Sequence, residues 1–150
     1  MNAPERRKLN KILVAVDGSE NAARAAEVAA AIASNANAEL TILHVIDMPV
    51  VPTGETYIPF DKIEDKAREE AGKFIPKLES VAKEIGVKTR IEIVDSFGSV
   101  VRAITDYADR EKIDLLVVGT RGLGGFKRLV LGSVASGLVQ YAHCSVLVVR

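Results

Sequence analysis

The stretch KILVAVDGSENAARAAEVAAAIAS, residues 11–34, contains a strand, a tight turn and a helix in immediate succession. Its first residues are mostly aliphatic and end at Asp17-Gly18-Ser19, a pattern typical of a buried strand that stops at a turn. Ser19 can cap the helix predicted over residues 20–34, which is rich in alanine. Because alanine side chains are small, we expect this helix to lie close to a sheet.

Four further apolar segments are predicted to be strands, namely residues 39–46, 88–95, 114–119 and 145–149. Helices are expected between them over residues 61–86, from about residue 99 to residue 111, and over residues 132–141. Asp61 and Glu64 have the spacing of a capping box at the head of the first of these helices. Pro76 is expected to kink or break that helix. Residues 47–60 contain three prolines and a glycine and are predicted to form a long loop.

This alternation of strands and helices predicts a parallel sheet that is covered by helices on both faces. Right-handed crossovers leave two favoured strand orders, 3-2-1-4-5 and the flavodoxin-like 2-1-3-4-5. Residues 88–95 alternate polar and apolar side chains, which suits an edge strand and favours the first order. We therefore expect a three-layer α/β/α sandwich with a five-stranded parallel sheet of order 3-2-1-4-5. The length suits one domain over residues 1–150, with residues 1–10 as an N-terminal tail.

The composition excludes several classes of protein. Twenty Lys and Arg balance twenty Asp and Glu, so the chain lacks the positive charge of a dedicated nucleic-acid binder. Apolar residues make up 48% of the sequence, which is too many for a disordered chain. The single cysteine, Cys144, cannot form an internal disulfide, and the two histidines are too far apart in sequence to suggest a zinc module.

One uncharged segment, residues 129–149, is long enough to cross a bilayer. It contains glycines, serines, a glutamine and a histidine, and its pattern changes at His143-Cys144 from that of a helix to that of a strand. We therefore interpret it as part of the globular domain and expect no membrane span. No apolar stretch follows the basic residues at the N-terminus, so no signal peptide is predicted, and the chain is expected to be cytoplasmic.

Two unusual local sequences are predicted to meet where the strand order reverses. In an open parallel sheet, ligands bind beyond the carboxyl ends of the strands at this point, here between the first and fourth strands. Asp17 ends the first strand, and GTRGLGGFKRLVLGS, residues 119–133, follows the fourth. Glycines allow backbone N–H groups to approach an anion, and a helix that starts at Gly132-Ser133 adds unpaired N–H groups. A phosphate is the ligand that this pattern favours, and Asp17 can accept hydrogen bonds from a ribose.

Each of these features also has a simpler interpretation. A glycine-rich loop is often only a flexible turn, and Asp17-Gly18-Ser19 is often only a turn and a helix cap. The loop also lacks the spacing of common nucleotide sites. No G-x-x-x-x-G-K-[ST] motif occurs, and no G-x-G-x-x-G motif follows the first strand. These absences argue against common P-loop NTPases and classical dehydrogenases.

The spacing of the glycines resembles that of a known family. Gly119, two residues, Gly122, nine residues and then Gly132-Ser133 form a G-x2-G-x9-G-[ST] pattern. Together with VAVDGS, ILHV and SVLVV, this pattern is similar to the ATP-binding branch of the universal stress protein family, over residues 11–150. The resemblance implies a Rossmann-like fold of the adenine nucleotide alpha hydrolase type.

The resemblance also implies a site for ATP or AMP, with magnesium accompanying the triphosphate. Asp17 would hold the ribose, whereas Ala15 and the backbone of Val45 would line the adenine pocket. Ala15 stands where some relatives have proline, which changes the wall of that pocket. Arg121 is open to two interpretations, a partner for a terminal phosphate or a solvated side chain. The full set of implied binding residues is Ala15, Asp17, Val45, Gly119, Arg121, Gly122, Leu123, Gly124, Gly125, Gly132, Ser133, Val134 and Ala135.

On this basis the chain is expected to be a stress-response switch or sensor and not a turnover enzyme, because the sequence offers no obvious base to activate water. Slow or partner-dependent ATP hydrolysis is compatible with this expectation. One alternative is a non-catalytic interaction module with an empty or AMP-filled pocket. A phospho-receiver domain using Asp95 would need an acidic pair after the first strand, and an adenylating enzyme would need a catalytic motif near that strand; neither is present.

The last strand predicts how the protein assembles. In the order 3-2-1-4-5, residues 145–149 form an apolar edge without charge or proline, which is prone to aggregation unless it is covered. Antiparallel pairing with the same strand of a second copy would cover this edge and produce a two-fold homodimer. The family resemblance implies the same dimer.

Overall fold

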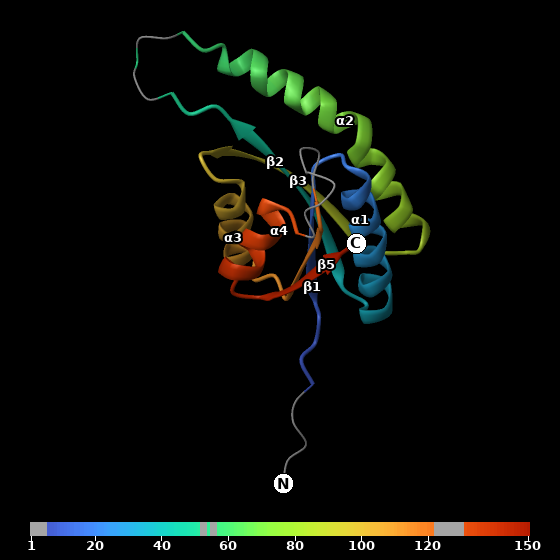
Figure 1. Ribbon diagram of the computed structural model, residues 1–150. Helices are drawn as coiled ribbons and strands as arrows, with labels where there is room; N and C mark the ends of the chain where they lie inside the picture. The colour runs from blue at the N-terminus through green and yellow to red at the C-terminus, as the bar shows by residue number, and fades with distance from the viewer. Residues whose placement is uncertain (1–5, 52–53, 55–56, 122–130) are drawn as a thin grey trace.

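A computed structural model describes residues 6–51, 54, 57–121 and 131–150. Within these residues, five strands form one parallel sheet of order β3-β2-β1-β4-β5, which confirms the predicted order (Figure 1). The strands are β1 (Lys11–Val16), β2 (Glu39–Met48), β3 (Thr89–Phe97), β4 (Leu115–Gly119) and β5 (Ser145–Val149).

In the same part of the chain, four helices cover the two faces of this sheet: α1 (Glu20–Ala36), α2 (Phe60–Glu84), α3 (Val100–Arg110) and α4 (Ser133–Tyr141). In Figure 1, α1 and α2 lie on one side of the strands, and α3 and α4 lie on the other. Two clusters of buried side chains match this arrangement, because one combines strand residues with α1 and α2 and the second combines them with α3 and α4. The predicted three-layer α/β/α sandwich is therefore confirmed.

The first helix forms as its sequence predicts. The Ser19 hydroxyl accepts a hydrogen bond from the backbone N–H of Ala22 at 3.1 Å, which satisfies one of the donors at the helix N-terminus. The helix ends at Asn37, whose φ of 52° places it in the left-handed region that terminates helices. Its buried face consists entirely of alanines, so its backbone packs close to β1 and β4.

The second helix differs from the prediction at its start. It begins at Phe60, and the preceding residue is Pro59, whose side chain has no hydrogen-bond acceptor. The predicted capping box of Asp61 and Glu64 is therefore wrong, and Asp61 instead lies inside the first turn, where its charge favours the helix dipole. The helix also runs without a break through Pro76, which is exposed, because the tertiary contacts of the buried positions around it outweigh one missing hydrogen bond.

The strands at the two edges differ from the central ones. Every residue of β4 is buried, whereas β3 is only partly buried along most of its length, as the alternating pattern of residues 88–95 predicted. At the opposite edge, β5 pairs with β4 on one side, and its last four residues are partly buried. Among the described residues, no helix is long and apolar enough to cross a membrane.

Candidate functional site

The turn after β1 places Asp17 at the carboxyl end of the sheet. The Asp17 Oδ1 atom accepts a hydrogen bond from the backbone N–H of Ser19 at 3.0 Å, so the side chain stabilises its own turn. Gly18 has a φ of 88°, a conformation that favours glycine. The side chain of Asp17 is half-buried. The Asp17 side chain, which is predicted to bind a ribose, is thus held in a defined geometry at the end of a buried strand.

The end of β4 lies beside this turn. Ala15 pairs with Val118, so the strands that carry Asp17 and Gly119 are neighbours in the sheet. A Cβ atom added to Gly119 would lie 2.9 Å from the backbone carbonyl of Asn21 in the first turn of α1. Gly119 is therefore required by close backbone packing at this position.

Thr120 and Gly132 flank the glycine-rich segment, most of which lies outside the described residues. The backbone N–H of Gly132 donates a hydrogen bond to the carbonyl oxygen of Thr120, which brings the two ends of the segment together. The N–H of Thr120 in turn donates to the carbonyl of Val149 in β5 at 2.9 Å. The start of α4 is therefore tied to the carboxyl end of β4.

The N-terminus of α4 has the geometry of an anion site. The first intrahelical bond runs from the N–H of Ser136 to the carbonyl of Gly132, so the N–H groups of Ser133, Val134 and Ala135 precede it. Such groups, together with the helix dipole, favour a negative charge. Ser133 is exposed, and its hydroxyl is an additional donor at the same end. The helix N-cap is Gly132, which has no side chain to compete for these N–H groups.

The predicted adenine contacts lie on the same face of the sheet as α4. Ala15 is buried in the cluster that includes Ala135, and Val45 is half-buried against this cluster. Val134 packs against it as well. The structure therefore brings residues from β1, β2 and α4 to one face at the carboxyl end of the sheet, which is where the sequence placed the site.

Gly122, Leu123, Gly124 and Gly125 lie outside the described residues, so their predicted contact with phosphates stays a prediction. Arg121 lies at the edge of the described region and is half-buried. Its predicted role at a terminal phosphate also stays a prediction.

Phe74, like Asn21, has a contact at the predicted site that the sequence did not indicate. Phe74 of α2 lies against Gly18, because a Cβ added to Gly18 would be 3.1 Å from the Phe74 ring. The same ring packs edge-to-face with the ring of His44, with 5.2 Å between their centroids. His44 is therefore a packed residue of β2. No local sequence signal identifies Phe74, since it lies in a helix far along the chain from Gly18.

His143 and Cys144, which precede β5, have contacts that suit a structural role. His143 Nδ1 lies 3.0 Å from Asp109 Oδ2, which links the start of β5 to α3. Burial raises the pKa of the Cys144 thiol, and the negative charge of Asp109 acts in the same direction. A raised pKa keeps the thiol protonated and weakly nucleophilic. Among the described residues, no cluster of His, Cys, Asp and Glu could hold a metal ion.

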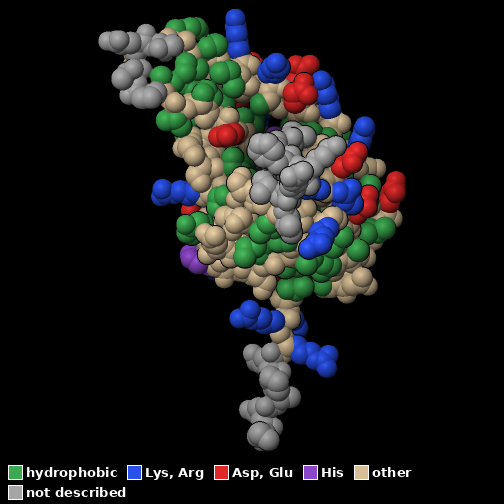
Figure 2. Space-filling view, viewed as in Figure 1, with side chains coloured by type: hydrophobic (Ala, Val, Ile, Leu, Met, Phe, Trp, Pro, Cys, Tyr) green, Lys and Arg blue, Asp and Glu red, His purple; other side chains and the backbone are tan. Residues whose placement is uncertain are grey.

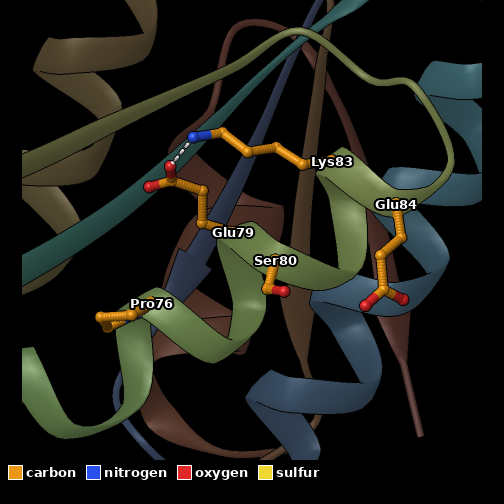
Figure 3. Close-up of a pocket in the computed structure, with 5 residues that line it drawn as sticks. All are labelled: Pro76, Glu79, Ser80, Lys83 and Glu84. Atoms are coloured by element: carbon orange, nitrogen blue, oxygen red, sulfur yellow. Dashed lines mark ion pairs between the residues drawn. The ribbon is translucent and has the colours of Figure 1, made fainter.

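Two further surface features involve none of the predicted site residues. Exposed apolar side chains gather where α2 begins and β3 ends (Figure 2), namely Val50, Tyr57, Phe60 and Phe97. A shallow depression on α2 is lined by Pro76, Glu79, Ser80, Lys83 and Glu84, with an ion pair between Glu79 and Lys83 (Figure 3). Because all of its lining residues belong to one helix and most are exposed, we interpret this depression as part of the uneven surface of α2 and not as a ligand site.

The groups described at the carboxyl end of the sheet are suited to binding a ligand. They combine backbone N–H donors for an anion, a carboxylate at a turn and a small apolar wall. These three elements suit the phosphate, sugar and base of a nucleotide, respectively.

Residues 8–150 match the family model described as "Universal stress protein family". Universal stress protein YxiE of Bacillus subtilis (strain 168) is 37% identical over 148 residues, covering 94% of this chain and 99% of the relative. Among solved structures, universal stress protein UspA from Lactobacillus plantarum is 30% identical, with a TM-score of 0.79. The match covers 97% of this chain and 100% of the UspA chain. A universal stress protein in complex with cAMP is also 30% identical, with a TM-score of 0.70. This match covers 96% of this chain and 99% of the solved chain.

Proposed function

The chain belongs to the universal stress protein family, and on this basis we propose that it binds an adenine nucleotide, with ATP as the ligand. We further propose that it acts as a dimeric switch or sensor in a cytoplasmic stress response. The observation that carries the proposal is the hydrogen bond from the Gly132 N–H to the Thr120 carbonyl, which ties the N-terminus of α4 to the carboxyl end of β4, the neighbour of the strand that Asp17 follows. The solved relative that holds cAMP supports an adenine nucleotide as the class of ligand.

In this proposal each part of the nucleotide has its own residues. The phosphates lie against the N–H groups of Ser133, Val134 and Ala135 and against the glycines of residues 122–125. Asp17 accepts hydrogen bonds from the ribose, and adenine packs beside Ala15 and Val45. Magnesium arrives with the triphosphate, because Mg²⁺ is commonly held by phosphates and water and needs few protein ligands.

The protein is proposed to act by binding and release and not by rapid turnover. Hydrolysis of a triphosphate needs a group that orients or activates water. Asp17 is assigned to the ribose and is engaged with Ser19 through Oδ1, so it is a poor candidate for this task. Any hydrolysis is expected to be slow or to depend on a partner.

The first test is thermal unfolding of nucleotide-free protein with and without Mg-ATP. A ligand at one hundred times its dissociation constant adds about 2.7 kcal/mol to stability, which raises the melting temperature of a chain of this size by about 5–10 °C. AMP is expected to give a smaller rise because it lacks two phosphates, and GTP is the control for base specificity. The absence of a shift with every nucleotide would contradict the proposal and would favour an interaction module.

The homodimer is proposed to form through the free edge of β5. Val139 and Tyr141, on the helix that precedes and contacts this strand, are 53% and 66% exposed and offer further apolar surface for the interface. We expect sedimentation to give twice the chain mass for the native protein, and Val139→Lys with Tyr141→Glu to shift it toward the monomer. Val81→Lys, at an exposed apolar position on α2, is the control and should leave the mass unchanged. A monomeric native protein would contradict this part of the proposal.

A further inference from the structure

We infer that His44 and Phe74 are positioning residues for the turn that carries Asp17, and that they thereby set the affinity of the site for the ribose. This inference rests on the proposed function, because it concerns the geometry of a nucleotide site. Neither residue is among those that the sequence assigns to ligand contact. They act on the turn from the α1 and α2 side of the sheet, opposite the face to which Ala15 and Val45 contribute.

The imidazole of His44 holds the peptide that joins Val16 to Asp17. His44 Nδ1 lies 2.8 Å from the carbonyl oxygen of Val16, with which it is in register across β1 and β2. A carbonyl oxygen can only accept, so the hydrogen must lie on Nδ1 and the ring donates. Because the peptide is planar, fixing its oxygen also fixes the N–H and the Cα direction of Asp17.

Phe74 acts on the other side of Asp17. Its ring lies within van der Waals reach of Gly18, as the 3.1 Å distance to a Cβ added there indicates. The ring also meets that of His44 nearly at right angles, with an interplanar angle of 84°, which is a favoured aromatic geometry. The residues before and after Asp17 are thus each held by one of two rings that contact each other.

The carboxylate between them has little freedom left. Its Oδ1 atom is bound to the Ser19 N–H, and the peptides on both sides are restrained by His44 and Phe74. A ligand that uses this carboxylate therefore does not need to order the turn when it binds, and preorganisation of this kind increases affinity. Loss of the His44 bond should loosen the turn and weaken the contact with the ribose selectively.

The test compares ATP with 2′,3′-dideoxy-ATP by calorimetry on the native protein and its variants. The ratio of the two dissociation constants measures the contribution of the ribose hydroxyls, which we expect to be about tenfold or more for hydrogen bonds to a carboxylate. His44→Leu replaces the imidazole with an apolar side chain that cannot donate a hydrogen bond, and it should reduce this ratio toward one. Asn at position 44 places an N–H donor at the same number of bonds from Cβ as Nδ1, so His44→Asn should restore most of the ratio.

Two further variants separate positioning from a general loss of stability. Ile42→Val removes one buried methyl group from the same face of β2 and should lower stability by a small amount without changing the ratio. Phe74→Leu should reduce the ratio in part, and it carries the test if His44→Leu fails to fold. An unchanged ratio in His44→Leu would overturn the inference, and if that variant does not fold, an unchanged ratio in Phe74→Leu would do so. A ratio in His44→Asn as low as that in His44→Leu would also overturn it.

The outcomes distinguish this inference from the proposed function. If the native protein binds no nucleotide, the proposed function is wrong and the inference is overturned with it. If it binds ATP and dideoxy-ATP equally, the nucleotide site stands, but the ribose contact and the inference are overturned. If only the variants behave unexpectedly, the inference alone is wrong.

Discussion

Gly132→Asp is expected to weaken ATP binding by about 100-fold, because it places a carboxylate at the N-terminus of α4, where the proposed phosphates lie. A unit charge about 5 Å from another contributes about 3 kcal/mol at an effective dielectric constant near 20, which is about two powers of ten in affinity. An aspartate at this position can also accept hydrogen bonds from the first N–H groups of the helix and so compete with the ligand for them.

The substitution should leave the fold intact. Gly132 has φ −70° and ψ 168°, values that any residue adopts, and aspartate is a favoured N-cap. A Cβ here would lie 3.1 Å from the carbonyl oxygen of Thr120, so a small local shift offsets part of the gain from the cap. We therefore expect the melting temperature of the ligand-free variant to change little.

Gly132→Asn is the matched control for this prediction. Asparagine has nearly the same size and also caps helices, but it carries no charge. Calorimetry with ATP should show an intermediate loss for asparagine and a much larger loss for aspartate. Equal affinities for the two variants would mean that no phosphate lies at α4, and the proposed orientation of the nucleotide would be wrong.

The order of elements could be predicted because each depends on a local pattern. The buried strands are continuous aliphatic runs, and Ser19 caps the first helix as expected. The edge position of β3 followed from its polar alternation. The start of α2 could not be predicted, because Asp61 and Glu64 have the spacing of a capping box but lie inside the helix. The helix also continues through Pro76, so of the kink or break expected there, the break does not occur.

The site could be predicted only where it depends on residues at strand and helix ends. Asp17 and Gly132 were identified because topology places strand ends and a helix start together. The roles of Phe74 and Asn21 could not be predicted, because each is a contact between segments that are distant in sequence. Such contacts depend on how closely two elements pack in the folded protein, and the spacing of residues within one segment does not specify that distance.

Gly119→Ala tests the closest of these contacts. The added Cβ would lie 2.9 Å from both the carbonyl carbon and the oxygen of Asn21, and backbone atoms cannot rotate away as a side chain can. Either α1 or the end of β4 must move, which should destabilise the protein by about 1–3 kcal/mol. Chemical denaturation should show this as a lower midpoint with an unchanged slope.

Gly72→Ala provides a control with the opposite expected sign. Gly72 is exposed inside α2, and a Cβ there would meet nothing within 4 Å. Alanine is favoured over glycine in a helix, so this variant should gain about 0.5–1 kcal/mol. A Gly119→Ala protein as stable as the native one would mean that α1 does not approach β4 so closely.

The same substitution should affect ligand binding through the turn of Asp17. Asn21 lies in the first turn of α1, directly after the turn of Asp17, Gly18 and Ser19. A shift of α1 would therefore also move Asp17, which is proposed to bind the ribose. We expect Gly119→Ala to weaken ATP binding even at temperatures where the variant is fully folded. Gly72→Ala should bind ATP normally, because its gain in stability arises far from the turn. A loss of affinity confined to Gly119→Ala would therefore link the close packing of α1 on β4 to the nucleotide site itself.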